Sequence, residues 1–191
     1  MIRILALLII ALTSCEGVQP SVVEDYFSLQ DVLDSQYKLL AETRSSLYKV
    51  ATAGNDSAQV LIHPDSVDWR KELGIFERLD INKPKLKGQF RIAMEEDEFS
   101  NLTIKSYTAL NNEAEVKYLK LFYLEEESNF RKLAAEWQES NPIYTSKRSL
   151  TLFFEDLSGK IILSGYEISG IQKMLLQDEK AFSLQAKIDH Q

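Results

Sequence analysis

The sequence contains few of the residues on which disulfides, metal centres and flexible linkers depend. Its 191 residues include one cysteine and two histidines. One cysteine cannot form an intrachain disulfide, and His63 and His190 fall short of the several His or Cys ligands that a zinc site requires. Four prolines and seven glycines are too few for a long linker. We therefore expect a core stabilised by packing alone, with no metal and no other cofactor.

Basic residues are also fewer than acidic ones. The 22 Lys and Arg residues stand against 29 Asp and Glu residues, which gives a formal net charge of −7. Nucleic-acid binding depends on the neutralisation of phosphates by basic side chains. We therefore expect no nucleic-acid partner. An apolar fraction of 45% and an aromatic fraction of 10% are typical of a folded domain.

Recognisable catalytic groups are also lacking. The stretch SGYEISG (164–170) does not have the G-x-S-x-G arrangement of a nucleophile elbow. The acidic runs 95–98 and 125–127 lack the alternating oxygen ligands and central glycine of a calcium loop, and we expect them in solvated loops. No glycine-rich phosphate loop is present in the sequence. These observations favour a protein that is not an enzyme.

The first fifteen residues, MIRILALLIIALTSC, are the most informative stretch. Arg3 is followed by an apolar run from Ile4 to Leu12. A membrane-spanning helix needs about 20 apolar residues, so this run is too short to span a bilayer. A short basic start, an apolar run and small residues after it are typical of a secretory signal peptide.

The quartet Leu12-Thr13-Ser14-Cys15 resembles the lipobox of bacterial lipoproteins. The resemblance implies cleavage between Ser14 and Cys15, and lipid attachment that anchors the protein to a membrane through Cys15. Several acyl chains give a stable anchor, whereas one gives marginal binding. The alternative is an ordinary signal peptide followed by a buried free cysteine. Glu16 is not the Asp associated with inner-membrane retention, so the resemblance implies the periplasmic face of the outer membrane in the cell envelope.

The chain is expected to comprise a signal peptide (1–14), a lipidated N-terminus with a short tether (15–20) and one domain (21–191). Within that domain we expect helices over 21–80 and mainly strands over 89–191. Five residues of tether reach at most about 18 Å when fully extended. The domain is therefore expected to lie close to its membrane.

Two amphipathic helices are expected first. Ser21-Val22-Val23-Glu24 has the form of a capping box, and apolar residues from Tyr26 to Ala51 recur at spacings of three and four. This stripe predicts one helix of about thirty residues that ends near Gly54-Asn55, packed on its own domain or, alternatively, against a second chain. A second helix is expected from Asp65 or Ser66 to Leu79.

The rest of the domain is rich in aromatic and β-branched residues, which is typical of strands. An Asp156–Gly159 turn predicts a hairpin, and 130–138 is ambiguous between helix and strand. We expect an α+β fold in which N-terminal amphipathic helices pack on a curved antiparallel β-meander of about six strands. The expected strands cover 90–94, 102–110, 116–124, 149–155, 160–169 and 181–188.

Two functions fit these expectations best. The first is a membrane-anchored envelope lipoprotein with a non-catalytic binding or scaffolding role, whose partner is an envelope protein or a second copy of the chain. The alternative is a carrier of lipid or another hydrophobic ligand, because the layout of the meander resembles the half-barrel carriers of the lipoprotein-sorting pathway. A carrier should have an apolar cavity lined by Leu121, Phe122, Phe153 and Ile162, whereas a scaffold should pack them solid. An enzyme with an unrecognised site is the third possibility.

Overall fold

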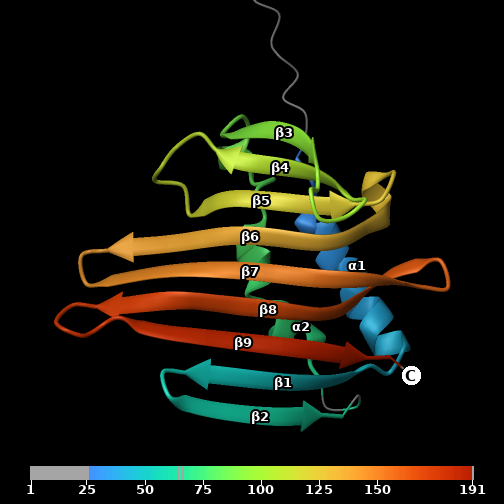
Figure 1. The fold of residues 1–191 in the computed structure, drawn as a ribbon, viewed down its shortest axis with the longest axis horizontal. Helices are drawn as coiled ribbons and strands as arrows, with labels where there is room; N and C mark the ends of the chain where they lie inside the picture. The colour runs from blue at the N-terminus through green and yellow to red at the C-terminus, as the bar shows by residue number, and fades with distance from the viewer. Residues whose placement is uncertain (1–25, 64, 66, 191) are drawn as a thin grey trace, which may run out of the picture.

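A computed structural model describes residues 26–63, 65 and 67–190 (Figure 1). The described residues form one large sheet, two α-helices and several short 3₁₀ helices. No helix among them is long and apolar enough to cross a membrane. The capping box at 21–24 lies outside the described residues. The helices are α1 (Leu29–Glu42), α2 (Trp69–Leu73), η2 (Phe76–Leu79), η3 (Pro84–Leu86) and η4 (Glu127–Asn129). The strands are β1 (Ser46–Ala53), β2 (Asp56–Ile62), β3 (Phe90–Glu96), β4 (Thr103–Ala109), β5 (Val116–Tyr123), β6 (Phe130–Asn141), β7 (Tyr144–Leu157), β8 (Lys160–Met174) and β9 (Lys180–Asp189).

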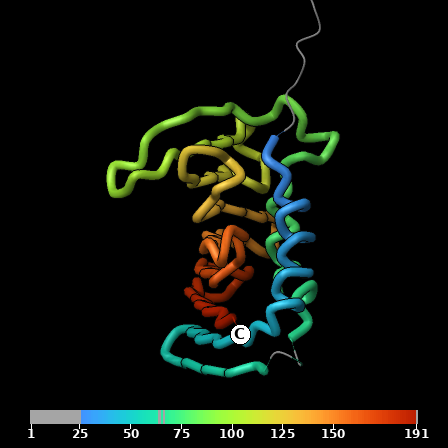
Figure 2. The backbone as a smooth tube through the Cα atoms, turned by 90° about the vertical axis from the view of Figure 1, so that its right-hand side faces the viewer, coloured from blue at the N-terminus to red at the C-terminus, as the bar shows by residue number. Residues whose placement is uncertain are grey.

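The nine strands form a single antiparallel sheet in the order β2-β1-β9-β8-β7-β6-β5-β4-β3. Strands β3 to β9 follow one another as a meander, and the β1–β2 hairpin extends the sheet beyond β9. Figure 2 shows α1 and the segment around η2 on one side of the sheet, which we call the inner face. We call the other side the outer face. No α-helix of the described residues packs on it.

The expected α+β class is wrong, because the described chain is largely β and its sheet has nine strands, not six. The last residues that we assigned to the thirty-residue helix form β1 and the turn that leads into β2. Helix α1 ends at Glu42, and Arg44, which interrupts the apolar stripe, adopts a φ of 45°. Beyond it the β-branched residues Val50, Thr52 and Val60 favour strands. Gly54, at a φ of 60°, lies in the turn between them and not at a helix end.

The second helix is also shorter than the sequence pattern predicted. Asp68, not Asp65, caps α2, and its side chain accepts a hydrogen bond from the backbone N–H of Lys71. The helix ends after five residues and continues as the 3₁₀ turn η2. The expected apolar face is nevertheless buried, since Leu73, Phe76 and Leu79 are fully enclosed.

Each segment that we expected to be a strand lies in a strand. The ambiguous segment 130–138 lies within β6, and the predicted turn joins β7 to β8. Ser158 and Gly159 in that turn both have positive φ, at 55° and 82°. Positive φ at both central residues is the two-residue geometry that matches the twist of paired strands.

Helix α1 packs on the inner face of its own sheet. Ser28 caps it by accepting a hydrogen bond from the N–H of Asp31. The stripe residues Leu29, Leu33 and Leu40 have 0–1% of their surface exposed. The apolar stripe therefore stabilises the contact between helix and sheet within one chain.

A buried glutamine joins α1 to an irregular point of the sheet. The register between β7 and β8 shifts after Phe153, where a bulge interrupts the ladder. There Gln36, with 1% exposure, donates to the carbonyl of Ile161 at 3.0 Å and accepts from the N–H of Leu163 at 2.8 Å. Its amide therefore satisfies two backbone groups that would otherwise be buried without partners.

Candidate ligand-binding site

The helices cover only one end of the long strands. Strand β8 has 15 residues and therefore extends about 50 Å, at ~3.3 Å per residue. Helix α1 lies across the strands (Figure 1) and covers a strip only about 10–12 Å wide. The segment around η2 lies beside it and roughly doubles that strip. The far ends of β6 to β9 therefore project beyond the helical layer.

The covered half of the inner face is closed. Leu133, Leu152 and Tyr166 occupy one register row beneath the helices, each with at most 1% exposure. The Tyr166 hydroxyl donates to Glu72 of α2, which also accepts a hydrogen bond from Lys49 at 2.8 Å. Burial and the contact with Glu72 raise the pKa of Tyr166 well above its ordinary value. These three side chains are therefore enclosed between the helices and the sheet.

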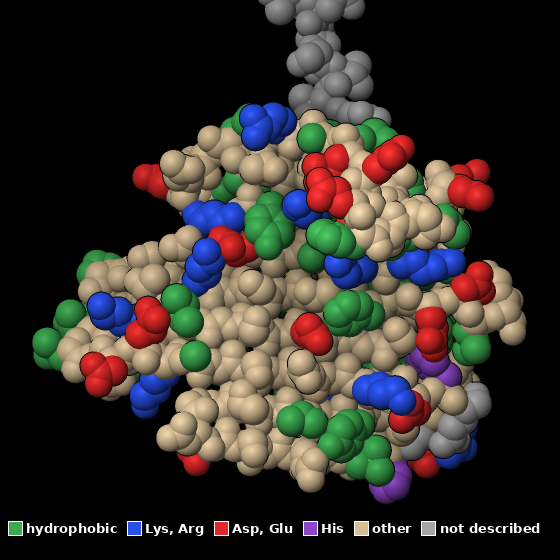
Figure 3. All heavy atoms as spheres, viewed as in Figure 1, with side chains coloured by type: hydrophobic (Ala, Val, Ile, Leu, Met, Phe, Trp, Pro, Cys, Tyr) green, Lys and Arg blue, Asp and Glu red, His purple; other side chains and the backbone are tan. Residues whose placement is uncertain are grey.

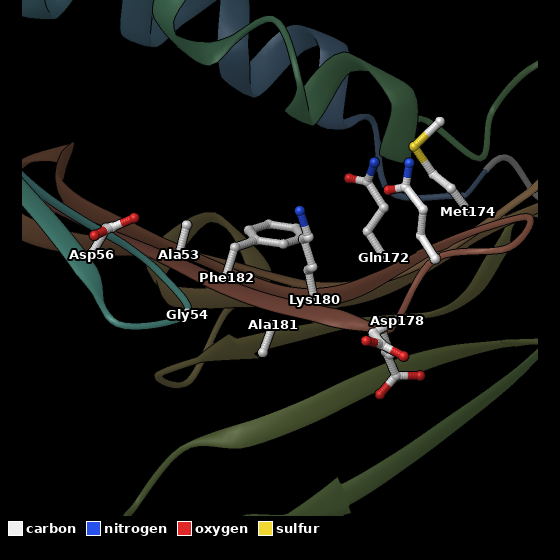
Figure 4. Close-up of a pocket in the computed structure, with 11 residues that line it drawn as sticks. Ala53, Gly54, Asp56, Gln172, Met174, Asp178, Lys180, Ala181 and Phe182 are labelled. Atoms are coloured by element: carbon white, nitrogen blue, oxygen red, sulfur yellow. The ribbon is translucent and has the colours of Figure 1, made fainter.

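The uncovered half contains a groove of about 590 Å³. Its lining residues come from the turn between β1 and β2, the end of β8 and the start of β9. In Figure 4 the side chains of Ala53, Phe182, Lys180, Gln172 and Met174 project from the sheet toward the side on which the helices lie. We call this groove and the inner-face residues beside it the open shelf. The shelf is defined by Ala53, Asp56, Trp137, Tyr144, Arg148, Gly170, Gln172, Met174, Lys180 and Phe182.

One register row runs through the open shelf. It places Trp137 of β6, Arg148 of β7, Gly170 of β8 and Phe182 of β9 side by side. A Cβ on Gly170 would clash with the backbone carbonyl oxygen of Lys147 and lie 3.1 Å from the Phe182 ring, which is closer than ordinary contact. The absent side chain therefore lets the Phe182 ring lie over the strand between it and Arg148. The Arg148 guanidinium lies 5.8 Å from the centroid of that ring.

The inner end of the shelf is basic and aromatic. The guanidinium of Arg148 lies 5.2 Å from the centroid of Trp137, and that of Arg78, from η2, lies 5.4 Å from it. Both distances are within the range of cation–π interactions. The indole N–H of Trp137 is buried and has no hydrogen-bond acceptor among the described residues. The outer rim of the groove, by contrast, carries Asp178 and Glu179.

The groove adjoins an apolar tip, formed by the β6–β7 and β8–β9 turns. Ile143, Leu175 and Leu176 are 64%, 61% and 97% exposed. Figure 3 shows hydrophobic side chains gathered at this end of the molecule. Met174 lines the groove and also the smaller cavity between the two turns. The apolar surface is therefore continuous from groove to tip.

The outer face has a different chemistry. Figure 3 shows a surface made mainly of backbone and of side chains that are neither charged nor hydrophobic. One register row of hydroxyl side chains crosses five strands, and the Thr52 and Ser183 hydroxyls lie 2.8 Å apart. The row consists of Ser57, Thr52, Ser183, Ser169 and Ser149. This face provides hydrogen-bonding groups beside a shallow cavity of about 390 Å³, whose lining includes Tyr48, Val50 and Phe153.

A serine, a histidine and a carboxylate meet at the opposite end of the sheet. Ser45 Oγ lies 2.8 Å from Nδ1 of His190, whose Nε2 lies 3.4 Å from Glu155. Burial lowers the pKa of His190, an effect that Glu155 and Asp189 partly oppose. Nucleophilic catalysis needs a serine that a substrate can reach. Since Ser45 is fully buried, we interpret the trio as a clasp between the α1–β1 turn, β7 and the end of β9.

The four residues expected to line a cavity do not share one surface. Leu121 and Ile162 are buried on the inner side, with 0% and 1% exposure. Phe122 and Phe153 lie on the outer face, on either side of Lys132, whose ammonium is 3.9 Å from the Phe122 centroid. The lipidation and cleavage residues Cys15 and Ser14 lie outside the described residues.

Sequence reasoning missed the shelf residues because strand pairing, and not the local sequence, brings them together. Arg148 and Gly170 have ordinary sequence neighbours, and only the pairing of β7, β8 and β9 places them beside Phe182. The one local signal was a glycine inside a strand pattern, which marks either a bulge or the close approach of another group. At Gly170 the approaching groups are the backbone carbonyl of Lys147 and the ring of Phe182.

Residues 26–63, 65 and 67–190 contain no group of three or more His, Cys, Asp or Glu side chains placed to hold a metal.

No family model and no curated protein matches the sequence. Among solved structures, a LolA superfamily protein from Nitrosomonas europaea aligns with 87% of this chain and 94% of its own. The identity is 10% and the TM-score 0.29. The two structures therefore superpose only loosely.

Proposed function

We propose that the protein is a non-catalytic binding protein of the bacterial envelope that holds a single-chain apolar or amphiphilic molecule on its open shelf. The observation that supports this most directly is the groove of about 590 Å³ at the uncovered end of the inner face. Ligand sites are typically clefts of about 300–1,000 Å³ with an apolar lining and a few polar groups. The groove has that size and that mixture of side chains.

The form of the apolar surface supports an elongated ligand. Phe182, Met174 and Ala53 provide apolar lining, and Met174 connects it to the exposed tip at Leu175 and Leu176. Burial of apolar surface contributes about 25 cal/mol per Å². A hydrocarbon chain that lies from the groove to the tip would bury both surfaces, whereas a compact molecule would bury only one.

The lipobox-like quartet supports a membrane anchor at Cys15. Attachment there would hold the protein at a bilayer, from which single-chain amphiphiles can be taken. The test is expression of the full chain and of Cys15→Ala in a bacterial host fed a labelled fatty acid. We expect the label and membrane partitioning only in the native chain. Unlabelled, soluble protein from both forms would refute the anchor.

The groove itself is tested by filling it. In Ala53→Trp an indole would occupy the groove, whereas in Thr52→Trp the same group would lie on the outer face of the same strand. Both chains would be titrated with N-phenyl-1-naphthylamine, an apolar probe that becomes fluorescent on burial. We expect Ala53→Trp to lose most of the binding and Thr52→Trp to retain it. Equal binding by both variants would refute the groove as the site.

The exposed tip favours a second candidate function, contact with an envelope protein. Ile143 and Leu176 form an exposed apolar surface at two turns. Exposed apolar patches often mark interaction sites. Leu176→Asp should then abolish cross-linking to that protein in the envelope while probe binding persists. Loss of probe binding with unchanged cross-linking would instead assign the tip to the ligand.

A further inference from the structure

Among the described residues, Arg148 in the open shelf and Arg78, which lines a neighbouring cavity, have no acidic partner. Arg148 donates hydrogen bonds only to neutral groups, the Ser146 hydroxyl at 3.2 Å and the Tyr144 hydroxyl at 3.4 Å. Arg78 contacts the ring of Trp137. Within the described chain neither guanidinium lies within 4.0 Å of a carboxylate. By contrast, Arg44 pairs with Asp65 and Arg70 with Asp34.

A guanidinium carries five N–H donors and no acceptor, and its planar fork fits carboxylate and phosphate oxygens. Arg148 is half-buried in strand β7, where Trp137 and Phe182 lie on either side of it. Its position is therefore fixed by the sheet, with donors left over after its two contacts. Hydrogen bonds from a charged donor to a charged acceptor are about twice as strong as neutral ones.

We infer that Arg148 forms an anion-recognition end of the groove, with Arg78 beside the same indole adding positive charge, and that the ligand is a single-chain amphiphile with an anionic headgroup. This inference rests on the proposed function and names the ligand class. A carboxylate and a phosphate monoester share the required chemistry. The headgroup would bind to the guanidinium of Arg148, and the chain would lie along Phe182 and Met174.

The charges around the shelf favour this orientation. Asp178 and Glu179 lie at the outer rim, where they repel an anionic headgroup and leave the inner end as the favourable position. Glu139 lies on the inner face two residues along β6 from Trp137, and among the described residues no ion pair joins it to Arg148. Asp56 adds a third carboxylate to the lining of the groove. Lys180, also in the groove, adds positive charge between the two ends.

The test compares three ligands that share one chain length: dodecanoate, dodecyl phosphate and dodecanol. Each would displace N-phenyl-1-naphthylamine at pH 8 and below its micellar concentration, from the full chain carrying Cys15→Ala so that no attached acyl group competes. We expect at least one of the anions to bind about tenfold more tightly than the alcohol, the factor that one charge-assisted hydrogen bond supplies.

The variants separate the inference from the proposed function. Arg78→Gln combined with Arg148→Gln should lower affinity for the anions about tenfold and leave dodecanol unchanged. Arg70→Gln is the matched control, because Arg70 also stacks on a ring, that of Tyr37, but away from the shelf. Unchanged thermal midpoints would show that the variants fold. Equal binding of acid and alcohol, or an unaffected anion preference in the double variant, overturns the headgroup site alone. Failure of all three ligands to bind overturns the groove as well.

Discussion

The two halves of the inner face are built from the same strands, yet they have opposite properties. Beneath α1 and η2, residues such as Leu133 and Leu152 are fully enclosed. Farther along the same strands, Arg148 is half-buried and Met174 is 44% exposed. The difference follows from length, because a helix lying across the strands covers only a strip of a sheet whose longest strand extends about 50 Å. One half therefore provides stability, and the other is left available for binding.

The largest expected effect contrasts a buried leucine with an exposed one. Leu33→Ala removes a fully buried side chain between α1 and the sheet and should lower the free energy of unfolding by about 2–5 kcal/mol. Leu176→Ala, at the 97% exposed tip, should change it by less than about 0.5 kcal/mol. Urea unfolding of both variants measures the difference. Similar losses would contradict the division of the inner face.

An intermediate effect is expected at Gln36. Gln36→Ala leaves the carbonyl of Ile161 and the N–H of Leu163 buried without partners, and should cost about 1–3 kcal/mol per unsatisfied group. Gln30→Ala is the matched control, because Gln30 bonds only to Asp34 on its own helix. Faster amide exchange at Leu163 in the Gln36 variant alone would confirm the bridge. An equal, small loss of stability in both variants would show that it contributes nothing.

The smallest expected effect is the pH dependence of the His190 clasp. Because burial lowers the pKa of His190 in the folded chain, the unfolded chain binds the proton more readily. The clasp therefore contributes fully above about pH 6.5, the ordinary value for histidine, and its contribution falls as the pH drops below that. Thermal midpoints measured from pH 8 to pH 5 should fall less in His190→Gln than in the native chain. His63→Gln, at an exposed position, should behave as the native chain does.

Much of the meander could be predicted from the sequence because its signals are local. Residues 116–124 are rich in aromatic and branched side chains. The Asp156–Gly159 turn contains residues that adopt the positive φ angles of a two-residue hairpin turn. The β1–β2 hairpin could not be predicted in this way. Leu47 and Ala51 continued the helical spacing by coincidence, although the helix ends at Glu42. Arg44, at a positive φ, marks the boundary between helix and strand. The β-branched residues around Val50 favour the strand that follows it, although the apolar stripe continues through them.

The candidate site was beyond sequence reasoning because it depends on register. A shift by one residue in the pairing of β7 with β8 would move Arg148 away from Gly170 and Phe182. Leu121 and Phe122 were expected to line one cavity, but consecutive residues of a strand point to opposite faces. Their apolar character could therefore not identify a common lining.

The most direct test of the account is to map a bound amphiphile onto the two halves of the inner face. Amide chemical shifts of the full chain carrying Cys15→Ala would be recorded by NMR as dodecanoate is added. We predict changes concentrated at Ala53, Arg148 and residues 170–182, with Leu33 and Leu152 unaffected. Changes centred on the contact between α1 and the sheet would contradict the account, because they would show that the covered half opens to take the ligand.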